Sequence, residues 1–109
     1  MLVTLLTRYL ERQPSFQVVG FDCPLKALAH LQHETADVLI TDLRMSVMDG
    51  DELARHARLK LPGIGIILAT SSDQHDVPSM SDSYQFISKP FEWHRVLLAV
   101  YRALPNDEA

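Results

Sequence analysis

The sequence predicts a single α/β domain in which an open parallel sheet carries helices on both faces. Segments with helical spacing of apolar residues alternate with short apolar segments typical of strands. Two of the strand segments, "DVLITD" and "IGIILAT", are apolar on both faces, which is typical of parallel strands covered by helices on either side. The 109 residues, 47% of them hydrophobic, are enough to build one such core.

The first third of the chain predicts a helix, a strand and a second helix. Apolar residues recur at helical spacing over residues 1–12. The segment "FQVVGF", residues 16–21, is rich in β-branched and aromatic residues and predicts a short strand. Asp22 is the expected cap of the next helix, which has Pro24 in its first turn and is expected to reach about His33.

The middle of the chain predicts two buried strands joined through a helix. The first strand is "DVLITD", residues 37–42, and a loop that contains Gly50 follows it. A helix is expected from about Asp51 until Pro62 interrupts it. The second strand is "IGIILAT", residues 64–70.

The last third begins with a polar stretch, residues 71–83, in which we expect only a short or irregular helix. "YQFIS" then predicts a short strand, and a final amphipathic helix is expected from about Glu92 to Leu104. Residues 105–109 are expected to fray. No repeat or low-complexity linker marks a second domain, so we expect one domain over residues 1–104.

The composition argues against several functional classes. The net charge is −4 and the ten basic residues are scattered, which does not favour a nucleic-acid-binding protein. Cys23 is the only cysteine, so the chain has no internal disulfide, and we expect a reducing compartment. No apolar run approaches the roughly 20 residues of a membrane span, and the N-terminus is charged too early for a secretory signal. We therefore expect a cytoplasmic protein without a membrane partner.

Three polar side chains stand at the ends of predicted strands. Asp42, Thr70 and Lys89 each end or directly follow a strand, and the carboxyl ends of parallel strands are where such sheets carry their chemistry. A carboxylate can attack phosphorus, a lysine can neutralise the developing charge, and a hydroxyl can hydrogen-bond a phosphoryl oxygen. The set therefore indicates phosphoryl chemistry.

Across essentially its whole length, the chain resembles the receiver domain of two-component response regulators. The resemblance rests on "DLRMSVMDG", with Asp42 at the phosphoacceptor position and Gly50 in the following loop, and on "IILATSS", which contributes the switch hydroxyl. "FISKPF" matches the Lys-Pro-Phe signature through Lys89 and Pro90, and Phe86 falls at the family's rotameric aromatic position. The resemblance implies a flavodoxin-like receiver fold, a bacterial two-component or phosphorelay pathway, and a histidine kinase or phosphorelay protein as partner.

The resemblance also points to what this chain lacks. A family receiver opens with an apolar strand that ends in two acids, and those acids hold Mg²⁺; "MLVTLL" offers no carboxylate in their place. Asp42 alone is a poor ligand set for an ion that needs near-octahedral oxygen coordination. We therefore expect no metal cofactor and slow or absent phosphorylation of this chain.

Loss of a central strand would leave strand edges unpaired, and such edges invite another chain. The resemblance therefore predicts a homodimer, with exchanged or augmented strands, or a partner that completes the sheet. The segment after Thr70 is shorter than is typical of the family, which puts the family's output face in doubt. Ser46 replaces the usual proline, a mild change in the loop beside Asp42.

Simpler interpretations stand beside these. Asp42 can be a relic that pairs with Lys89, and Phe86 can be a core residue rather than a switch. His75 in its polar loop and the His30–His33 pair lack the further ligands that a metal site needs. No nucleophile elbow, Cys/His pair or glycine-rich phosphate loop indicates an enzyme with chemistry of its own.

Overall fold

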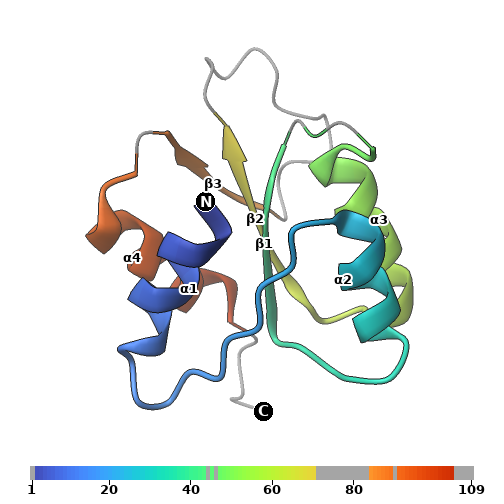
Figure 1. Ribbon diagram of the computed structural model, residues 1–109, viewed down its shortest axis with the longest axis horizontal. Coiled ribbons are helices and arrows are strands. Elements are labelled where there is room, and N and C mark those ends of the chain that lie inside the picture. Colours follow the sequence, from blue (N-terminus) through green and yellow to red (C-terminus); the bar gives the residue numbers. More distant parts are fainter. Residues whose placement is uncertain (1, 44, 46, 71–83, 90, 105–109) are drawn as a thin grey trace.

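The computed structural model describes residues 2–43, 45, 47–70, 84–89 and 91–104. The described elements are four helices and three strands, in the order α1 (Leu2–Glu11), α2 (Pro24–Leu31), β1 (Val38–Asp42), α3 (Gly50–Lys60), β2 (Gly65–Thr70), β3 (Gln85–Ser88) and α4 (Trp93–Ala103). The strands form one parallel sheet in the order β1-β2-β3, with β2 in the centre (Figure 1). The predicted open α/β architecture is confirmed.

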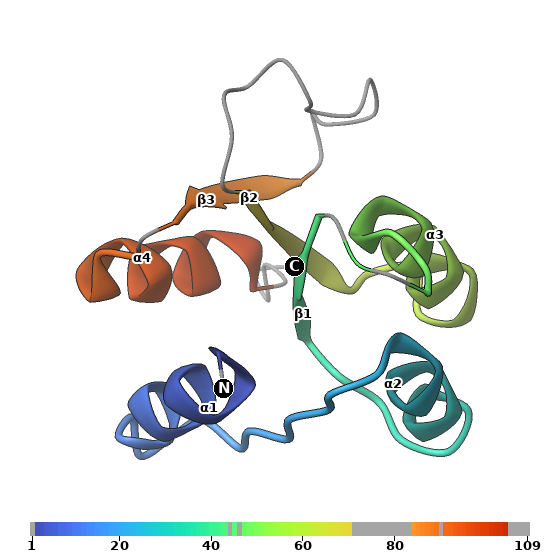
Figure 2. The same cartoon turned by 45° about the horizontal axis from the view of Figure 1, so that its top comes forward.

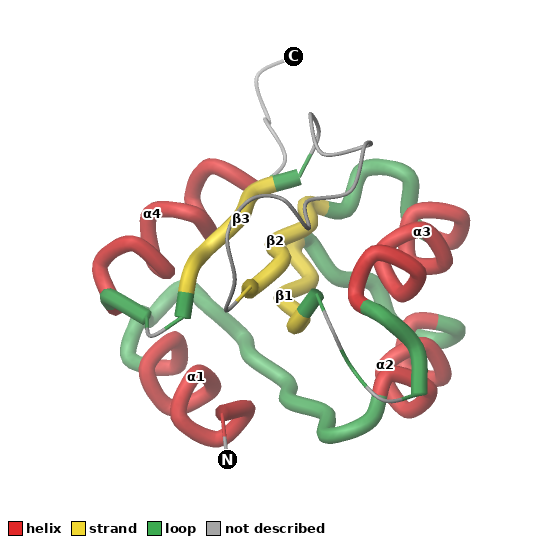
Figure 3. The backbone as a smooth tube through the Cα atoms, turned by 90° about the horizontal axis from the view of Figure 1, so that it is seen from above, coloured by secondary structure: helices red, strands yellow, loops and turns green. Residues whose placement is uncertain are grey.

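The helices cover both faces of the sheet. Figures 2 and 3 show α1 and α4 on one side and α2 and α3 on the other. The alternating side chains of β2 divide between the two layers: Ile66 and Leu68 belong to the cluster with α3, and Ile67 and Ala69 belong to the cluster with α4. Every residue of β2 is buried, as the apolar run predicts for a strand covered on both faces.

β1 has the same two-sided packing but is less completely covered. Val38 and Ile40 pack against the cluster of α1 and α4, whereas Leu39 packs against the cluster of α2 and α3. All three side chains are only partly buried. Among the described strands, β2 is the one neighbour of β1, so β1 lies at an edge of the sheet.

The predicted strand at residues 16–21 is wrong. Residues 16–21 form no strand or helix in the structure, and Figure 2 shows this segment running from α1 to α2 beside the sheet. The segment has the β-branched and aromatic residues of a strand, but no described strand lies beside it in hydrogen-bonding register. A strand needs a partner for its backbone groups, and local propensity does not supply one.

Two smaller differences concern helix ends. The N-cap of α2 is Cys23, not Asp22, and it makes no side-chain cap hydrogen bond. Asp22 instead lies 3.5 Å from Lys26 in an exposed ion pair. The final helix is confirmed, because α4 spans Trp93–Ala103 with Glu92 as its N-cap.

Three further expectations fall outside the described residues. They are the short helix within 71–83, the Ser46 substitution and the frayed tail at 105–109. None of the helices that the structure describes has both the length and the apolar character needed to span a membrane.

Candidate functional site

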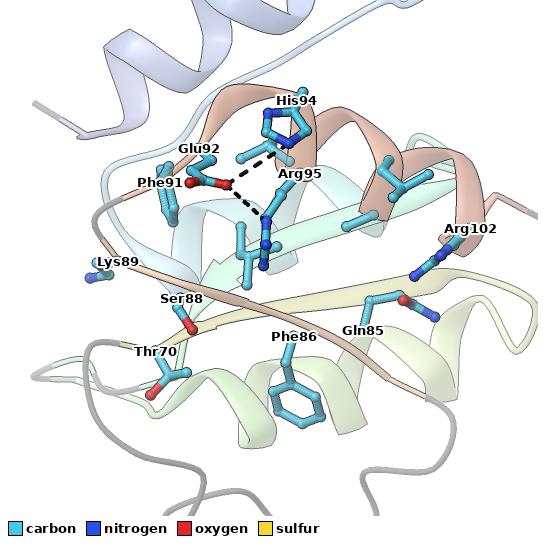
Figure 4. Close-up of a pocket in the computed structure, with 14 residues that line it drawn as sticks. Thr70, Gln85, Phe86, Ser88, Lys89, Phe91, Glu92, His94, Arg95 and Arg102 are labelled. Carbon is cyan, nitrogen blue, oxygen red and sulfur yellow. Dashed lines mark ion pairs between the residues drawn. The ribbon is translucent and has the colours of Figure 1, made fainter.

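The carboxyl ends of the three strands come together at one edge of the sheet. In the parallel register, Asp42 lies opposite Ala69 and Thr70 lies opposite Ser88. Because the strands are parallel, the residues that end them share this edge, as the sequence predicts. Lys89 follows directly after β3 and lies at the same edge (Figure 4).

Asp42 and Lys89 form a close ion pair. The Nζ atom of Lys89 lies 2.8 Å from Oδ1 of Asp42, and the two side chains are 33% and 30% exposed respectively. Water therefore reaches both groups, which weakens the pair relative to a fully buried one. The contact places a cation against the carboxylate and leaves the second carboxylate oxygen outside this ion pair.

Backbone hydrogen bonds hold the chain segments that carry the site. The N–H of Lys89 donates to the carbonyl oxygen of Thr70 at 2.9 Å, and the N–H of Leu43 donates to the carbonyl oxygen of Ala69 at 2.8 Å. Both segments are thereby fixed to the end of the central strand. The side chain of Thr70 is buried at this point, and the role predicted for its hydroxyl stays a prediction.

The loop after β1 is closed by Gly50, which is also the first residue of α3. Its N–H donates to the carbonyl oxygen of Leu43 at 2.8 Å. A Cβ atom at position 50 would collide with the carbonyl oxygen of Asp42. Because glycine has no side chain, α3 can begin directly against the end of β1. Within the same loop, the N–H of Met45 donates to Oδ1 of Asp49 at 3.4 Å.

Thr41 is a site-proximal residue that sequence reasoning did not select. Its hydroxyl is buried and lies 3.2 Å from the carbonyl oxygen of Asp42 and 3.6 Å from the sulfur of Met45. The hydroxyl therefore links the end of β1 to the following loop. The available signal was a single hydroxyl residue placed between the apolar run "VLI" and Asp42.

Phe86 packs as a core residue. Its side chain is partly buried against the cluster that contains α3, and Figure 4 shows the ring directed away from the side chains of α4. Phe86 thus packs against the core from its edge, and both a core role and a switching role stay predictions. Pro90 lies outside the described residues.

An aromatic cluster that the sequence analysis missed extends from the site to α1. The rings of Phe91 and Trp93 are 5.9 Å apart between centroids, and those of Trp93 and Tyr9 are 4.9 Å apart. Phe91 is two residues beyond Lys89. Because Tyr9 is far from Phe91 and Trp93 in the sequence, only the fold brings it beside them.

A hollow lies along β3 and α4, with Thr70 and Lys89 among its lining residues (Figure 4). At the start of α4, Glu92 forms an ion pair with Arg95 at 2.9 Å and lies 3.9 Å from His94. These side chains are largely exposed, so the ion pairs are of the weak surface kind.

The described residues do not fit a divalent-metal site. No group of three or more His, Cys, Asp or Glu side chains in the described part of the chain could hold a metal ion together. Asp42 is one carboxylate, and it already faces Lys89. Mg²⁺ is bound by carboxylates together with waters or phosphates in a demanding octahedral geometry, which this donor set does not provide by itself.

Comparison with known proteins gives a consistent result. The model of the response regulator receiver domain matches residues 1–101. The chain is 34% identical over 93 residues to the C4-dicarboxylate transport transcriptional regulatory protein DctD of Rhizobium meliloti, covering 81% of this chain and 20% of that protein. It is 29% identical over 90 residues to the sensory transduction protein LytT of Bacillus cereus, covering 81% of this chain and 37% of that protein. The chain thus spans well under half the length of these relatives.

Solved structures agree in fold. The Vibrio cholerae chemotaxis protein CheY4 superposes with a TM-score of 0.84 at 22% identity, covering 94% of this chain and 89% of that one. A response regulator receiver protein from Sinorhizobium medicae superposes with a TM-score of 0.77 at 24% identity, covering 94% of this chain and 84% of that one. At these identities the likeness concerns the fold alone.

Proposed function

Because the chain belongs to the response regulator receiver domain family, we propose that this receiver is poorly equipped for Mg²⁺-dependent phosphorylation and signals by binding other proteins. Its setting is a two-component pathway, which in our proposal is bacterial. The observation that carries the proposal is the ion pair of Lys89 with Asp42, formed where no group of three or more His, Cys, Asp or Glu side chains among the described residues could hold a metal ion. The proposal includes no enzymatic turnover.

The chemical reason is the charge at Asp42. A phosphoryl donor is an anion, and a carboxylate that attacks it is another, so the approach requires positive charge to offset their repulsion. Among the described ion pairs, Lys89 supplies that charge to Asp42. Each loss of about 1.4 kcal/mol of transition-state stabilisation slows the transfer tenfold, so lack of a divalent ion costs orders of magnitude in rate.

The proposal applies to the residues of this sequence. Carboxylates from another polypeptide, placed beside Asp42, would change it.

A second candidate function is a working phosphoacceptor. The convergence of Asp42, Thr70 and Lys89 at one edge of the sheet favours it, because these are the groups that phosphoryl transfer to a carboxylate needs besides the metal. A histidine kinase would donate: the P–N bond of its phosphohistidine breaks and a P–O bond forms to a carboxylate oxygen of Asp42. Lys89 and Thr70 would then contact the phosphoryl oxygens.

The two functions differ in their response to a phosphoryl mimic. Beryllofluoride with Mg²⁺ is added to the protein and to the Asp42→Asn variant, and the thermal midpoint of each is measured. We expect the same small change of the thermal midpoint in both proteins, because beryllofluoride does not bind stably to Asp42 unless Mg²⁺ is bound beside it. A rise of several degrees in the protein that Asp42→Asn abolishes would establish the phosphoacceptor function instead.

Partner binding is tested separately. Receiver domains generally work with histidine kinases, so a panel of purified kinases is offered to the protein and to the Asp42→Asn variant in a binding assay without ATP. The proposal predicts that a kinase or phosphorelay protein that binds the unmodified protein also binds the Asp42→Asn variant, with equal affinity. Binding that requires both ATP and Asp42 would contradict it.

A further inference from the structure

We propose that Thr41 is a positioning residue of the site: its hydroxyl holds the peptide group that follows Asp42 and thereby directs the Asp42 carboxylate toward Lys89. The inference rests on the proposed function in one respect, which is that the ion pair of Asp42 with Lys89 is the centre of the site. It concerns the geometry of that pair alone, so it can be tested without Mg²⁺ and without a phosphoryl donor.

The peptide group between Asp42 and Leu43 is held at both of its polar atoms. Its carbonyl oxygen, which belongs to Asp42, lies 3.2 Å from the hydroxyl of Thr41. Its N–H, which belongs to Leu43, donates to the carbonyl oxygen of Ala69 at 2.8 Å. Because a peptide group is planar, holding both atoms fixes its orientation and with it the dihedral angle ψ of Asp42.

Two further features constrain the backbone at Asp42. Asp42 is the last residue of β1 and lies opposite Ala69 in the parallel register, which places its backbone relative to β2. A Cβ atom at position 50 would collide with the carbonyl oxygen of Asp42, so there is little free space on that side of the peptide group. Together these contacts set the direction in which the side chain of Asp42 leaves the backbone.

Lys89 is anchored to the same end of the central strand. Its N–H donates to the carbonyl oxygen of Thr70 at 2.9 Å, next to Ala69, which holds the peptide group after Asp42. The side chains of Lys89 and Asp42 are 33% and 30% exposed, and a pair in contact with water pays side-chain entropy to keep one geometry. Its population therefore depends on how well the two backbones direct the side chains toward each other.

The hydroxyl of Thr41 has two acceptors in reach but one hydrogen to donate. The carbonyl oxygen of Asp42 lies at 3.2 Å and the sulfur of Met45 at 3.6 Å. A thioether sulfur is a weak acceptor, so the carbonyl oxygen is the preferred partner. The hydroxyl thus acts mainly on the peptide group of Asp42 rather than on the loop.

The residue type at position 41 supports a specific use of the hydroxyl. Thr41 is 9% exposed and follows three apolar residues of β1. Burying a hydroxyl costs free energy unless it is hydrogen-bonded, and valine would fill nearly the same space in such a strand without that cost. Packing alone would therefore be served as well by valine, whereas holding the carbonyl of Asp42 requires the hydroxyl.

The test measures the ion pair through the nitrogen resonance of the Lys89 ammonium, detected by way of the carbon-bound protons of its side chain. Asp42→Asn gives the resonance of Lys89 without its carboxylate partner. In Thr41→Val the resonance should move toward that value, corresponding to an ion-pair equilibrium weakened by about twofold to tenfold, the effect of one ordinary hydrogen bond. Thr41→Ser keeps the hydroxyl and should restore the resonance of the unmodified protein. The exposed pair of Lys26 with Asp22 belongs to α2 and is the internal reference that no variant should change.

This measurement separates positioning from a structural role. If Thr41 only packs in β1, Thr41→Val changes the free energy of unfolding but leaves the Lys89 resonance where it was, and that result would overturn the proposal. An equal shift in Thr41→Ser would also overturn it, because the methyl group and not the hydroxyl would then be responsible.

A further measurement uses the unmodified protein and needs no variant to fold. The hydroxyl proton of Thr41 should exchange with water much more slowly than that of Thr35, which is exposed. Equal exchange rates would show that the hydroxyl does not hold the carbonyl of Asp42. All these measurements are made without Mg²⁺, so their failure is distinct from failure of the proposed function, which beryllofluoride and Mg²⁺ test.

Discussion

The ammonium of Lys89 lies 2.8 Å from the carboxylate of Asp42, so the residue after β3 reaches across the end of the central strand to the end of β1. This contact connects the two outer strands of the described sheet at their carboxyl ends. Its partners are each about one-third exposed, at 33% and 30%. The pair is thus better suited to setting the charge at Asp42 than to holding the fold together.

The first prediction concerns this ion pair. Asp42→Asn and Lys89→Met should each change the free energy of unfolding by no more than about 1 kcal/mol, because solvent screens the pair. A double-mutant cycle by denaturant unfolding measures the coupling, which should fall further at high salt. A coupling of several kcal/mol that salt does not change would show that the pair is structural.

A second prediction concerns the close approach of α3 to β1. Gly50→Ala should lower the free energy of unfolding by about 1–3 kcal/mol, because the new Cβ collides with the backbone carbonyl of Asp42. Gly63→Ala is the matched control, since nothing lies within 4 Å of a Cβ there. Chemical denaturation of both variants measures the difference, and equal stabilities would contradict the packing described for Gly50.

A third prediction concerns the central strand. Leu68 is fully buried, with 0% exposure, so Leu68→Ala should cost about 2–5 kcal/mol through lost burial and the cavity that remains. Leu59 on α3 is 80% exposed, and Leu59→Ala should change the stability by less than about 0.5 kcal/mol. If thermal or urea unfolding gave similar losses for the two leucines, the placement of β2 in the core would be wrong.

The sequence is sufficient to predict those elements whose pattern reflects their own environment. The apolar run that became β2 and the amphipathic spacing that became α4 each report directly on which faces are covered. The convergence of Asp42, Thr70 and Lys89 follows from the parallel topology, because each residue ends or follows a strand. Predicting the fold class therefore also predicts the position of the site.

Features that depend on a distant partner could not be predicted in this way. The segment 16–21 has the composition of a strand but finds no neighbour with which to pair. The helix α2 begins at Pro24, so its N-cap is Cys23 and not Asp22. Asp22 forms an ion pair with Lys26. The stacking of Tyr9 on Trp93 joins residues near opposite ends of the chain, which no local pattern encodes.

A fourth prediction concerns that aromatic contact. Tyr9 and Trp93 have ring centroids 4.9 Å apart and connect α1 to α4. A double-mutant cycle with Tyr9→Leu and Trp93→Leu should give a coupling of about 0.5–1.5 kcal/mol, since leucine keeps much of the apolar volume but loses the ring contact. A coupling indistinguishable from zero would show that the rings do not interact in solution. Trp93 fluorescence provides the unfolding signal for the Tyr9 variant, and circular dichroism serves for the others.

The most direct measurement of the central claim is a titration of the protein with Mg²⁺, followed by calorimetry and by the amide resonance of Asp42, with Asp42→Asn as the control. One carboxylate that already faces a lysine should give no saturable binding that distinguishes the protein from the variant. Saturable Mg²⁺ binding that moves the Asp42 resonance and is lost in Asp42→Asn would contradict the account.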